Sequence, residues 1–250
     1  MPAMKVAIVT GSSSGIGAAT AIELSRRGWR VVVNYSKSRE QAEQTVKSCK
    51  EAIAVQANVG ADADCRKLAK AALDKWGRID ALVNNAGTTK LVAHQKLDEL
   101  SDEDFIRIYR VNVVAAFQMT RACAPALKEA RGAVVNVSSL AAKLGTGSSI
   151  AYAASKSALN TVTLSLARVL APEVRVNAVC PGHVDTPWQR AWHGARAEEV
   201  KQRYAERAPL KSSPEPEDIA DAIVWLIEGA RKTTGETIFV DAGMHAATPR

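Results

Sequence analysis

The sequence predicts one α/β domain spanning residues 1–250, with a seven-stranded parallel sheet that is doubly wound, so that helices cover both faces. Three observations lead to this prediction. The length of 250 residues suits a single large domain, and no linker, internal repeat or low-complexity stretch divides the chain. Short runs that are apolar throughout alternate with segments of helical period almost from end to end. Strands that are apolar on both faces and are joined by helices indicate a parallel sheet covered on both sides.

The first half of the chain supplies four strands and the helices between them. A β-rich run leads into a glycine turn, and the helical spacing after that turn ends at Gly28, a residue suited to a helix C-terminus. A charged helix follows the second strand and ends near residue 49. We expect strands at 5–10, 30–35, 52–58 and 80–87, and further helices at 15–28 and 62–76.

The second half supplies three more strands and longer helices. Ser101 is a suitable N-cap for a long helix, because its side chain can accept a backbone hydrogen bond and acidic residues follow it. Pro172 ends the next helix, and Pro216 suits the first turn of the last one. We expect helices at 101–129, 150–170 and 216–228, and strands at 132–139, 174–182 and 236–243.

Residues 183–215 fit neither pattern. Ligands of open α/β sheets bind outside the carboxyl ends of the strands, so we expect a substrate lid in this segment. It contains Trp188 and Trp192, for which two interpretations are equally open: they line a pocket for a bulky apolar substrate, or they pack the lid on the core.

Composition argues against several classes of protein. The net charge is +7, but the basic residues alternate with acids along helix-like segments, so we expect no nucleic-acid partner. No run of 18 apolar residues occurs, and the first residues pass directly into a strand without a signal-peptide pattern, so we expect a cytoplasmic protein without a membrane partner. The cysteines form no C-x-x-C pair and are expected to be reduced thiols, and the histidines lack zinc-ligand spacing, so we expect no metal.

The segment "VTGSSSGIGAA" permits two interpretations. Its G-x-S-x-G pattern fits the nucleophile elbow of a serine hydrolase, for which Ser13, Asp185 and His245 occur in the required order. Position argues against this, because Ser13 follows the first strand and no earlier loop can supply an oxyanion hole. The alternative is a glycine-rich turn between strand and helix, which receives the pyrophosphate of a dinucleotide in a Rossmann fold. Gly11, Gly15 and Gly17 meet its demands, and we favour it.

Six motifs in order resemble the short-chain dehydrogenase/reductase family. They are "TGSSSGIG" (10–17), "NNAG" (84–87), Asn112 in "RVNVVAAF", Ser139 in "VVNVSS", "YAASK" (152–156) and "NAVCPG" (177–182). Ser139 precedes Tyr152 by 13 residues, a separation typical of these enzymes. The resemblance covers the chain to about residue 243, and among family members it is greatest to 3-oxoacyl-acyl-carrier-protein reductases. It implies an oxidoreductase that interconverts a carbonyl and a secondary alcohol by hydride transfer.

The catalytic residues implied by the resemblance are Asn112, Ser139, Tyr152 and Lys156. Tyr152 and Lys156 are four residues apart on an expected helix and share one face, and we expect the ammonium to lower the tyrosine pKa so that Tyr152 acts as general acid or base. By resemblance, Ser139 polarises the substrate carbonyl, Asn112 supports a proton-relay water, and Lys156 also binds the nicotinamide ribose. Asn112 has a simpler interpretation, as a kinking or buried hydrogen-bonding residue. A non-catalytic regulatory relative is a further alternative, against which the intact set argues.

The cofactor expected is NADP(H), with NAD(H) possible. NAD-binding proteins of this architecture place an acid after the second strand, whereas residues 31–39 contain none and offer hydroxyl groups with Lys37 and Arg39. Tyr35 and Ser36 are the expected 2′-phosphate contacts; Ser14, where many NADP-preferring relatives carry a basic residue, argues the other way. Asn58 stands where many relatives carry an aspartate near adenine. The expected cofactor-binding residues are Gly11, Ser13, Ser14, Gly15, Ile16, Gly17, Asn34, Tyr35, Ser36, Asn58, Val59, Asn85, Ala86, Gly87, Tyr152, Lys156, Pro181, Gly182, Val184 and Thr186.

Two kinds of partner are expected. One is a small-molecule carbonyl or alcohol substrate, whose identity the sequence leaves open. The other follows from the resemblance, since relatives are usually homotetramers in which the helices near 101–129 and 150–170 pack across one interface.

Overall fold

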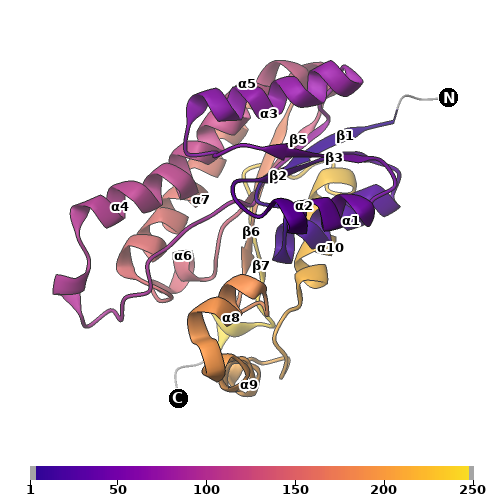
Figure 1. Cartoon of the computed structure of the whole chain (residues 1–250). Helices are drawn as coiled ribbons and strands as arrows, with labels where there is room; N and C mark the ends of the chain where they lie inside the picture. The colour runs from indigo at the N-terminus through magenta and orange to yellow at the C-terminus, as the bar shows by residue number, and fades with distance from the viewer. Residues whose placement is uncertain (1–3, 248–250) are drawn as a thin grey trace.

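Seven parallel strands form one sheet in the computed structural model, which describes residues 4–247 (Figure 1). Their order is β3-β2-β1-β4-β5-β6-β7, so the predicted doubly wound parallel sheet is confirmed. The ends of the predicted domain, residues 1–3 and 248–250, lie outside the described residues. The strands are β1 (Val6–Val9), β2 (Arg30–Tyr35), β3 (Ala52–Gln56), β4 (Ala81–Asn84), β5 (Ala133–Val137), β6 (Arg175–Pro181) and β7 (Thr237–Val240).

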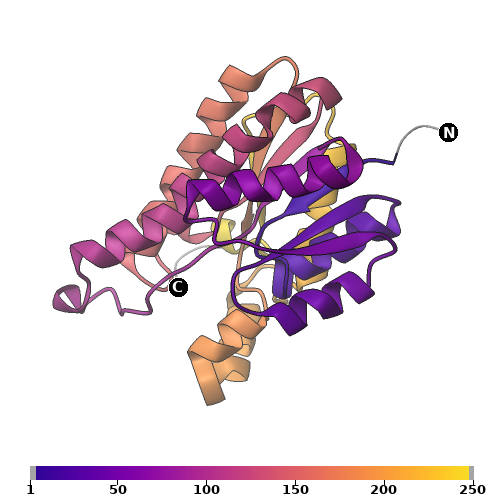
Figure 2. The same cartoon turned by 45° about the horizontal axis from the view of Figure 1, so that its top comes forward.

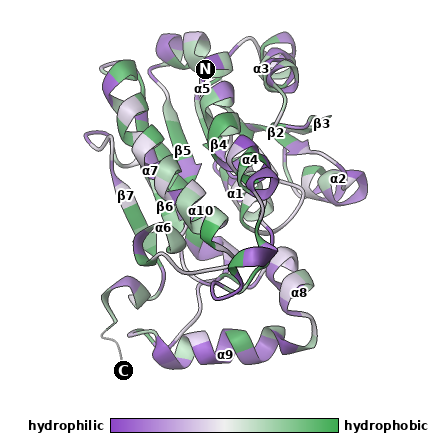
Figure 3. Ribbon diagram, turned by 90° about the vertical axis from the view of Figure 1, so that its left-hand side faces the viewer, coloured by the Kyte–Doolittle hydropathy of each residue, from purple (hydrophilic) through white to green (hydrophobic). Residues whose placement is uncertain are grey.

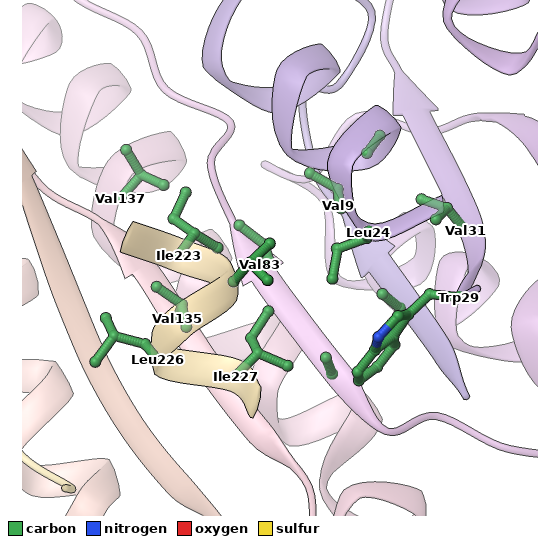
Figure 4. Packing of buried hydrophobic residues seen from close by; sticks show 14 of the residues in the cluster. Val9, Leu24, Trp29, Val31, Val83, Val135, Val137, Ile223, Leu226 and Ile227 are labelled. Carbon is green, nitrogen blue, oxygen red and sulfur yellow. The ribbon is translucent and has the colours of Figure 1, made fainter. Parts of the chain in front are cut away.

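Helices cover both faces of the sheet because each strand buries apolar side chains on both sides. One face carries α1 (Gly15–Arg26), α2 (Arg39–Lys47) and α10 (Pro216–Glu228), and the other carries α3 (Asp62–Trp76), α5 (Ala115–Ala130) and α7 (Ile150–Leu170). Figure 4 shows the first interface, where Ile223, Leu226 and Ile227 of α10 lie near Val83, Val135 and Val137 of the sheet. Alternate residues of the same strands, such as Ile8 and Leu82, face the second cluster.

The winding direction changes at β1. This strand pairs with β2 on one side and with β4 on the other, so the chain from β1 to β3 proceeds toward one edge of the sheet and the chain from β4 to β7 proceeds toward the other edge. A crevice forms at such a switch point, beyond the carboxyl ends of the strands. The glycine turn after β1 and the "NNAG" turn after β4 therefore lie side by side at this edge, where a ligand site is expected.

The helix expected over 101–129 is interrupted. It begins as α4 (Asp102–Tyr109), where the Ser101 side chain caps the backbone N–H of Asp104 and Asp104 returns the bond. A π-helical turn, Arg110–Val114, follows before α5 begins. The expectation of a uniform helix was therefore wrong in its middle. A π turn inserts one extra residue, and such turns are frequent at functional sites. It contains the buried Asn112.

The segment expected as a lid forms two short helices at one end of the molecule, drawn in orange in Figures 1 and 2. They are α8 (Pro187–His193) and α9 (Ala197–Arg207), with a 3₁₀ turn at Gly194–Arg196 between them. Neither helix has a buried residue, and α9 is largely hydrophilic (Figure 3). The Tyr204 hydroxyl holds α9 to the body by donating to the Asp241 carbonyl at 2.7 Å.

Short helical turns complete the described chain. They are Leu97–Glu99, Ala141–Leu144 (α6) and Met244–Ala246. None of the helices within residues 4–247 has the length and apolar character that crossing a membrane requires. All four cysteines are free, as expected, and three of them are buried.

Candidate active site

A cavity of about 1050 Å³ runs along the carboxyl edge of the sheet. It reaches from the turn after β2, past the glycine turn, to the lid. The structure brings nineteen of the residues named from the sequence to its wall: Gly11, Ser13, Ser14, Gly15, Ile16, Asn34, Ser36, Asn58, Val59, Asn85, Ala86, Gly87, Ser139, Tyr152, Lys156, Pro181, Gly182, Val184 and Thr186. Gly17, Tyr35 and Asn112 are not among the residues that line the cavity.

The glycine turn needs its glycines for two physical reasons. Gly11 and Gly15 have φ values of +60° and +55°, in the left-handed region that favours glycine. Gly17 has no room for a side chain, because a Cβ atom there would lie 2.5 Å from the Gly11 carbonyl oxygen and 2.8 Å from the Ser12 Cα. The turn thus forms a tight, side-chain-free cradle at the N-terminus of α1, where backbone N–H groups and the helix dipole favour an anion.

Hydrogen bonds between neighbouring strands hold this cradle in place. The Thr10 hydroxyl donates to the Val83 carbonyl and accepts from the backbone N–H groups of Asn85 and Ala86 at 3.0 Å. The Asn85 amide donates to the carbonyls of Thr10 and Gly11, both at 2.9 Å. The "NNAG" turn therefore fixes the glycine turn directly.

The end of β2 differs from the sequence-based expectation. Asn34 is 2% exposed, and its amide is committed to the protein, accepting from the Gly11 N–H at 3.0 Å and donating to the Ala57 carbonyl at 3.1 Å. The Tyr35 side chain is 8% exposed and belongs to the apolar cluster on the face of the sheet that carries α1, α2 and α10, so it does not line the cavity as expected. Ser36 and, beyond it, Lys37 and Ser38 line the cavity instead.

Ser139 and Tyr152 converge from different elements. Ser139 follows β5, and its hydroxyl accepts from the Ala141 N–H at 3.1 Å. Tyr152 lies in the first turn of α7, where the Ser149 side chain accepts its backbone N–H at 3.2 Å. Burial raises the pKa of Tyr152 to about 12, and the adjacent Ser139 hydroxyl acts in the opposite direction. This direction is opposite to the expected lowering of the tyrosine pKa, because desolvation disfavours the tyrosinate more than the Ser139 hydrogen bond stabilises it.

Lys156 extends beside Tyr152 into the same space. Its Nζ lies 5.7 Å from the centre of the Tyr152 ring and donates to the Val137 carbonyl at 2.7 Å. The side chain is buried, and desolvation lowers its pKa to about 8. Ser138, adjacent to Ser139, also lines the cavity, but its hydroxyl is committed to the fold because it donates to the Lys156 carbonyl at 3.1 Å.

Asn112 forms hydrogen bonds next to Tyr152 and Lys156. Its amide oxygen accepts from the Thr88 N–H at 2.8 Å, and its amide nitrogen donates to the Thr88 carbonyl at 3.0 Å and to the Ser155 hydroxyl at 2.9 Å. Gly87 lies between Asn112 and the lysine: a Cβ atom at Gly87 would be 3.4 Å from the Asn112 Oδ1 and 3.8 Å from the Lys156 Nζ. The π turn thus ties α5 to α7 next to the lysine.

The lid supplies the opposite wall. Trp188 and Trp192 both line the cavity, and neither belongs to an apolar core cluster. Their ring centres are 3.9 Å apart, and the Trp188 ring meets the Tyr152 ring edge-on at 6.3 Å. Of the two interpretations left open by the sequence, the structure supports the one in which these tryptophans line the pocket.

The serine-hydrolase alternative was wrong. His245 contacts Asp241 at 3.0 Å, while Asp185 pairs with Arg190 at 2.7 Å and with Lys201 at 3.3 Å. Neither forms a hydrogen bond to Ser13, so no triad is assembled. Within residues 4–247, no group of three or more potential ligand side chains could hold a metal ion.

Sequence reasoning missed the residues that hold the site together. Thr10 precedes the glycine turn, and a hydroxyl at the end of a central strand could have indicated its role. Ser155 lies three residues after Tyr152, but nothing in the sequence indicates that it meets Asn112. The Val137 carbonyl that accepts from Lys156 has no sequence signal at all.

The glycine cradle and the Ser139–Tyr152–Lys156 group in one cavity define a Rossmann-fold oxidoreductase. The family model described as "Enoyl-(Acyl carrier protein) reductase" matches residues 11–245. The chain belongs to the short-chain dehydrogenase/reductase family. Enzymes of this family act on carbonyl or alcohol groups with a nicotinamide cofactor.

Individual relatives match over nearly the whole chain. A Streptomyces violaceoruber protein, named as ketoacyl reductase 2 of the granaticin polyketide synthase, is 42% identical over 98% of this chain and 97% of its own length. The 3-oxoacyl-acyl-carrier-protein reductase of Staphylococcus epidermidis is 33% identical over 96% of this chain and 99% of its own. The crystal structure of a tryptophan variant of the actinorhodin polyketide ketoreductase with NADPH has a TM-score of 0.87 and 30% identity, with 97% of each chain covered.

Proposed function

We propose that this enzyme interconverts a carbonyl and a secondary alcohol with NADP(H), using Tyr152 as the proton donor and acceptor. The observation that carries the proposal is the meeting of Tyr152, Ser139 and Lys156 beside the glycine cradle. The test is a turnover screen of varied carbonyls with NADPH and NADH, followed by the loss of cofactor absorbance. No turnover with either cofactor across aliphatic, aromatic and acyl-thioester carbonyls would contradict the proposal.

The residues present fit a dinucleotide. Gly11 and Gly15 open the cradle for a pyrophosphate, and a side chain at Gly17 would collapse it. Asn85, Ala86 and Gly87 line the adjacent wall, and Thr186 lies close enough that its methyl group would be 3.1 Å from a Cβ at Gly15. The bound cofactor supplies the hydride, and the protein supplies orientation and a proton.

The proton chemistry follows from the two buried side chains. With a pKa raised to about 12, Tyr152 keeps its proton at neutral pH and suits donation to a substrate carbonyl oxygen. The Ser139 hydroxyl, anchored by Ala141, holds that oxygen beside the tyrosine. Lys156, with a pKa lowered to about 8, is charged below that pH and stabilises the tyrosinate left behind. Asn112 holds Thr88 and Ser155 through hydrogen bonds, and its proposed role is to support the return of a proton to Lys156.

NADPH is expected to bind more tightly than NADH. Ser36, Lys37 and Ser38 line the cavity beyond β2, and no carboxylate occurs in residues 31–39 to pair with a ribose 2′-hydroxyl. Ser36→Asp should weaken NADPH binding by about 10- to 100-fold, the range for losing a hydrogen bond to a charged group, and should change NADH binding little. Fluorescence titration gives both dissociation constants.

The matched control for that variant is Lys47→Gln at the exposed end of α2, away from the cavity. It lowers the net charge by the same amount as Ser36→Asp. Equal losses of NADPH affinity in both variants would assign the effect to net charge. Tighter binding of NADH by the wild type would overturn the preference itself.

A homotetramer is expected in solution. Helices α4, α5 and α7 expose large apolar side chains, including Ile106 at 56%, Phe117 at 44% and Val169 at 68%. Exposed apolar surface of this kind marks an interface between proteins. Light scattering at micromolar concentration should give about four times the 26.7 kDa chain mass. A monomer mass would refute the assembly.

The four free thiols favour a reducing, cytoplasmic location.

A further inference from the structure

The half of the cavity around Tyr152 differs in chemistry from the half around the glycine turn. Its lid side is formed by the tryptophan pair, Trp188 and Trp192, and Leu91 contributes a further exposed apolar side chain. Among the cavity-lining residues that the structure describes, none is Asp, Glu or Arg, and Lys156 is held by the Val137 carbonyl. This half therefore offers aromatic surface, hydroxyl groups, the Gln189 amide and the imidazoles of His183 and His193, with no carboxylate or guanidinium for a charged substrate.

The structure shows no contribution of the tryptophan pair to the stability of the fold. No residue of α8 is buried, and Trp188 is 39% exposed. The helix is held at its N-terminus instead, where the Thr186 hydroxyl accepts from the Gln189 N–H at 3.3 Å and Asp185 pairs with Arg190. Trp188 is exposed, Trp192 is partly buried, and both line the cavity, so a ligand bound there would cover apolar area that the fold leaves open.

The geometry also sets the shape of that ligand. The Trp188 and Trp192 rings are in contact, and the edge of Trp188 meets the Tyr152 ring, so a continuous aromatic wall leads to the tyrosine hydroxyl. Aromatic rings prefer offset or edge-to-face neighbours with centres about 4.5–7 Å apart. A flat ring system beside this wall would gain such contacts while its attached carbonyl reached Ser139 and Tyr152.

We propose that the substrates are aromatic carbonyl compounds, and the corresponding alcohols, whose ring system packs against Trp188 and Trp192. This substrate class rests on the proposed carbonyl–alcohol chemistry. It goes beyond that chemistry by assigning recognition to aromatic contact rather than to apolar area alone. A flexible acyl chain would gain burial from the same wall but no preference for an aromatic ring.

The test compares 2-acetylnaphthalene with 2-acetyldecalin, its saturated counterpart of similar size. Dissociation constants are measured by equilibrium dialysis, with and without NADP⁺, which cannot reduce either ketone. We expect the wild type to bind the naphthyl ketone at least about fivefold more tightly, the scale of an aromatic pair contact. Trp188→Leu should reduce this preference to within about twofold, while Trp188→Phe should retain most of it. Trp225→Leu, an exposed tryptophan on α10 outside the cavity, is the control and should leave the preference intact.

Turnover provides the second readout. For each enzyme, we take the ratio of kcat/KM for 2-acetylnaphthalene to kcat/KM for 2-acetyldecalin. Comparing this ratio between the wild type and Trp188→Leu removes the intrinsic difference in reactivity between the two ketones. Equal binding of the two ketones by the wild type, or a preference that survives Trp188→Leu, would overturn the proposal. A Trp188-dependent binding preference without reduction by NADPH or NADH would instead contradict the proposed reaction and leave the aromatic site standing.

Discussion

Replacing Tyr152 by Phe is expected to abolish turnover while the fold and cofactor binding persist. The substitution removes only the hydroxyl, and the ring keeps its contacts with Ala141, Ala153 and Trp188. Loss of a general acid costs roughly 10²- to 10⁴-fold in rate. Steady-state kinetics should therefore show kcat reduced by at least about 10²-fold, and circular dichroism and cofactor titration should match the wild type.

Tyr109→Phe is the matched control, because it removes the same hydroxyl from a tyrosine outside the cavity. It should retain wild-type turnover. The pH profile gives an independent check. Since burial raises the Tyr152 pKa to about 12, alcohol oxidation, which needs the tyrosinate as base, should accelerate as pH rises above neutrality. A kcat of the Tyr152→Phe variant within a few-fold of the wild-type value would show that another group transfers the proton. A rate of alcohol oxidation that does not change with pH would show the same.

Replacing Gly17 by Ala is expected to damage both stability and cofactor binding. The added Cβ would lie 2.5 Å from the Gly11 carbonyl oxygen and from the Asn85 Nδ2, so the backbone of the cradle must move. Overpacking of this kind costs about 1–3 kcal/mol. Thermal unfolding should show a lower Tm, and the dissociation constant for NADPH should rise by about tenfold or more, since a loss of about 1.4 kcal/mol is already tenfold.

Gly28→Ala separates crowding from backbone strain. Gly28 has a φ of +86°, yet nothing lies within 4 Å of a Cβ added there. This variant should lose about 1 kcal/mol of stability from its positive φ and should bind NADPH like the wild type. If both variants bind NADPH normally, Gly17 serves folding and the cradle is not the dinucleotide site.

The sheet could be predicted from the sequence because its pattern is local. A parallel strand covered on both faces is apolar at every position, as in "RVVVNY", and this pattern is readable without knowing its neighbours. A kink at Asn112 was one interpretation of the sequence, but the π-helical turn at Arg110–Val114 could not be specified from it, because the hydrogen-bond partners of Asn112, which are Thr88 and Ser155, lie elsewhere in the chain. The hydrophobic periodicity of residues 101–129 indicates one helix and contains no information on contacts with Thr88 and Ser155.

The site could be predicted to the extent that motif spacing specifies it. The separation of Ser139 and Tyr152 in the sequence correctly indicated that the two residues meet in one cavity, but it contains no information on burial. Burial raises the Tyr152 pKa. The charge of the neighbouring Lys156, which is all that the sequence shows, predicts a lowering instead. Burial also keeps the Tyr35 side chain off the cavity wall, because its ring belongs to the apolar cluster on the face that carries α1, α2 and α10. Side-chain direction at the end of a buried strand depends on tertiary packing, which the composition of "NYSKS" does not reveal.

The unburied helix α8 has an evolutionary consequence. The cradle is tied by Thr10 and Asn85 to two central strands, so most changes there threaten the fold. No residue of α8 is buried, so mutations at Trp188 or Trp192 can accumulate without large losses of stability. If the proposed contact with substrate holds, selection can alter which compounds this enzyme accepts, one substitution at a time, while the residues around the cradle stay unchanged. A directed-evolution library confined to the seven residues of α8 would explore new substrates in molecules that still fold.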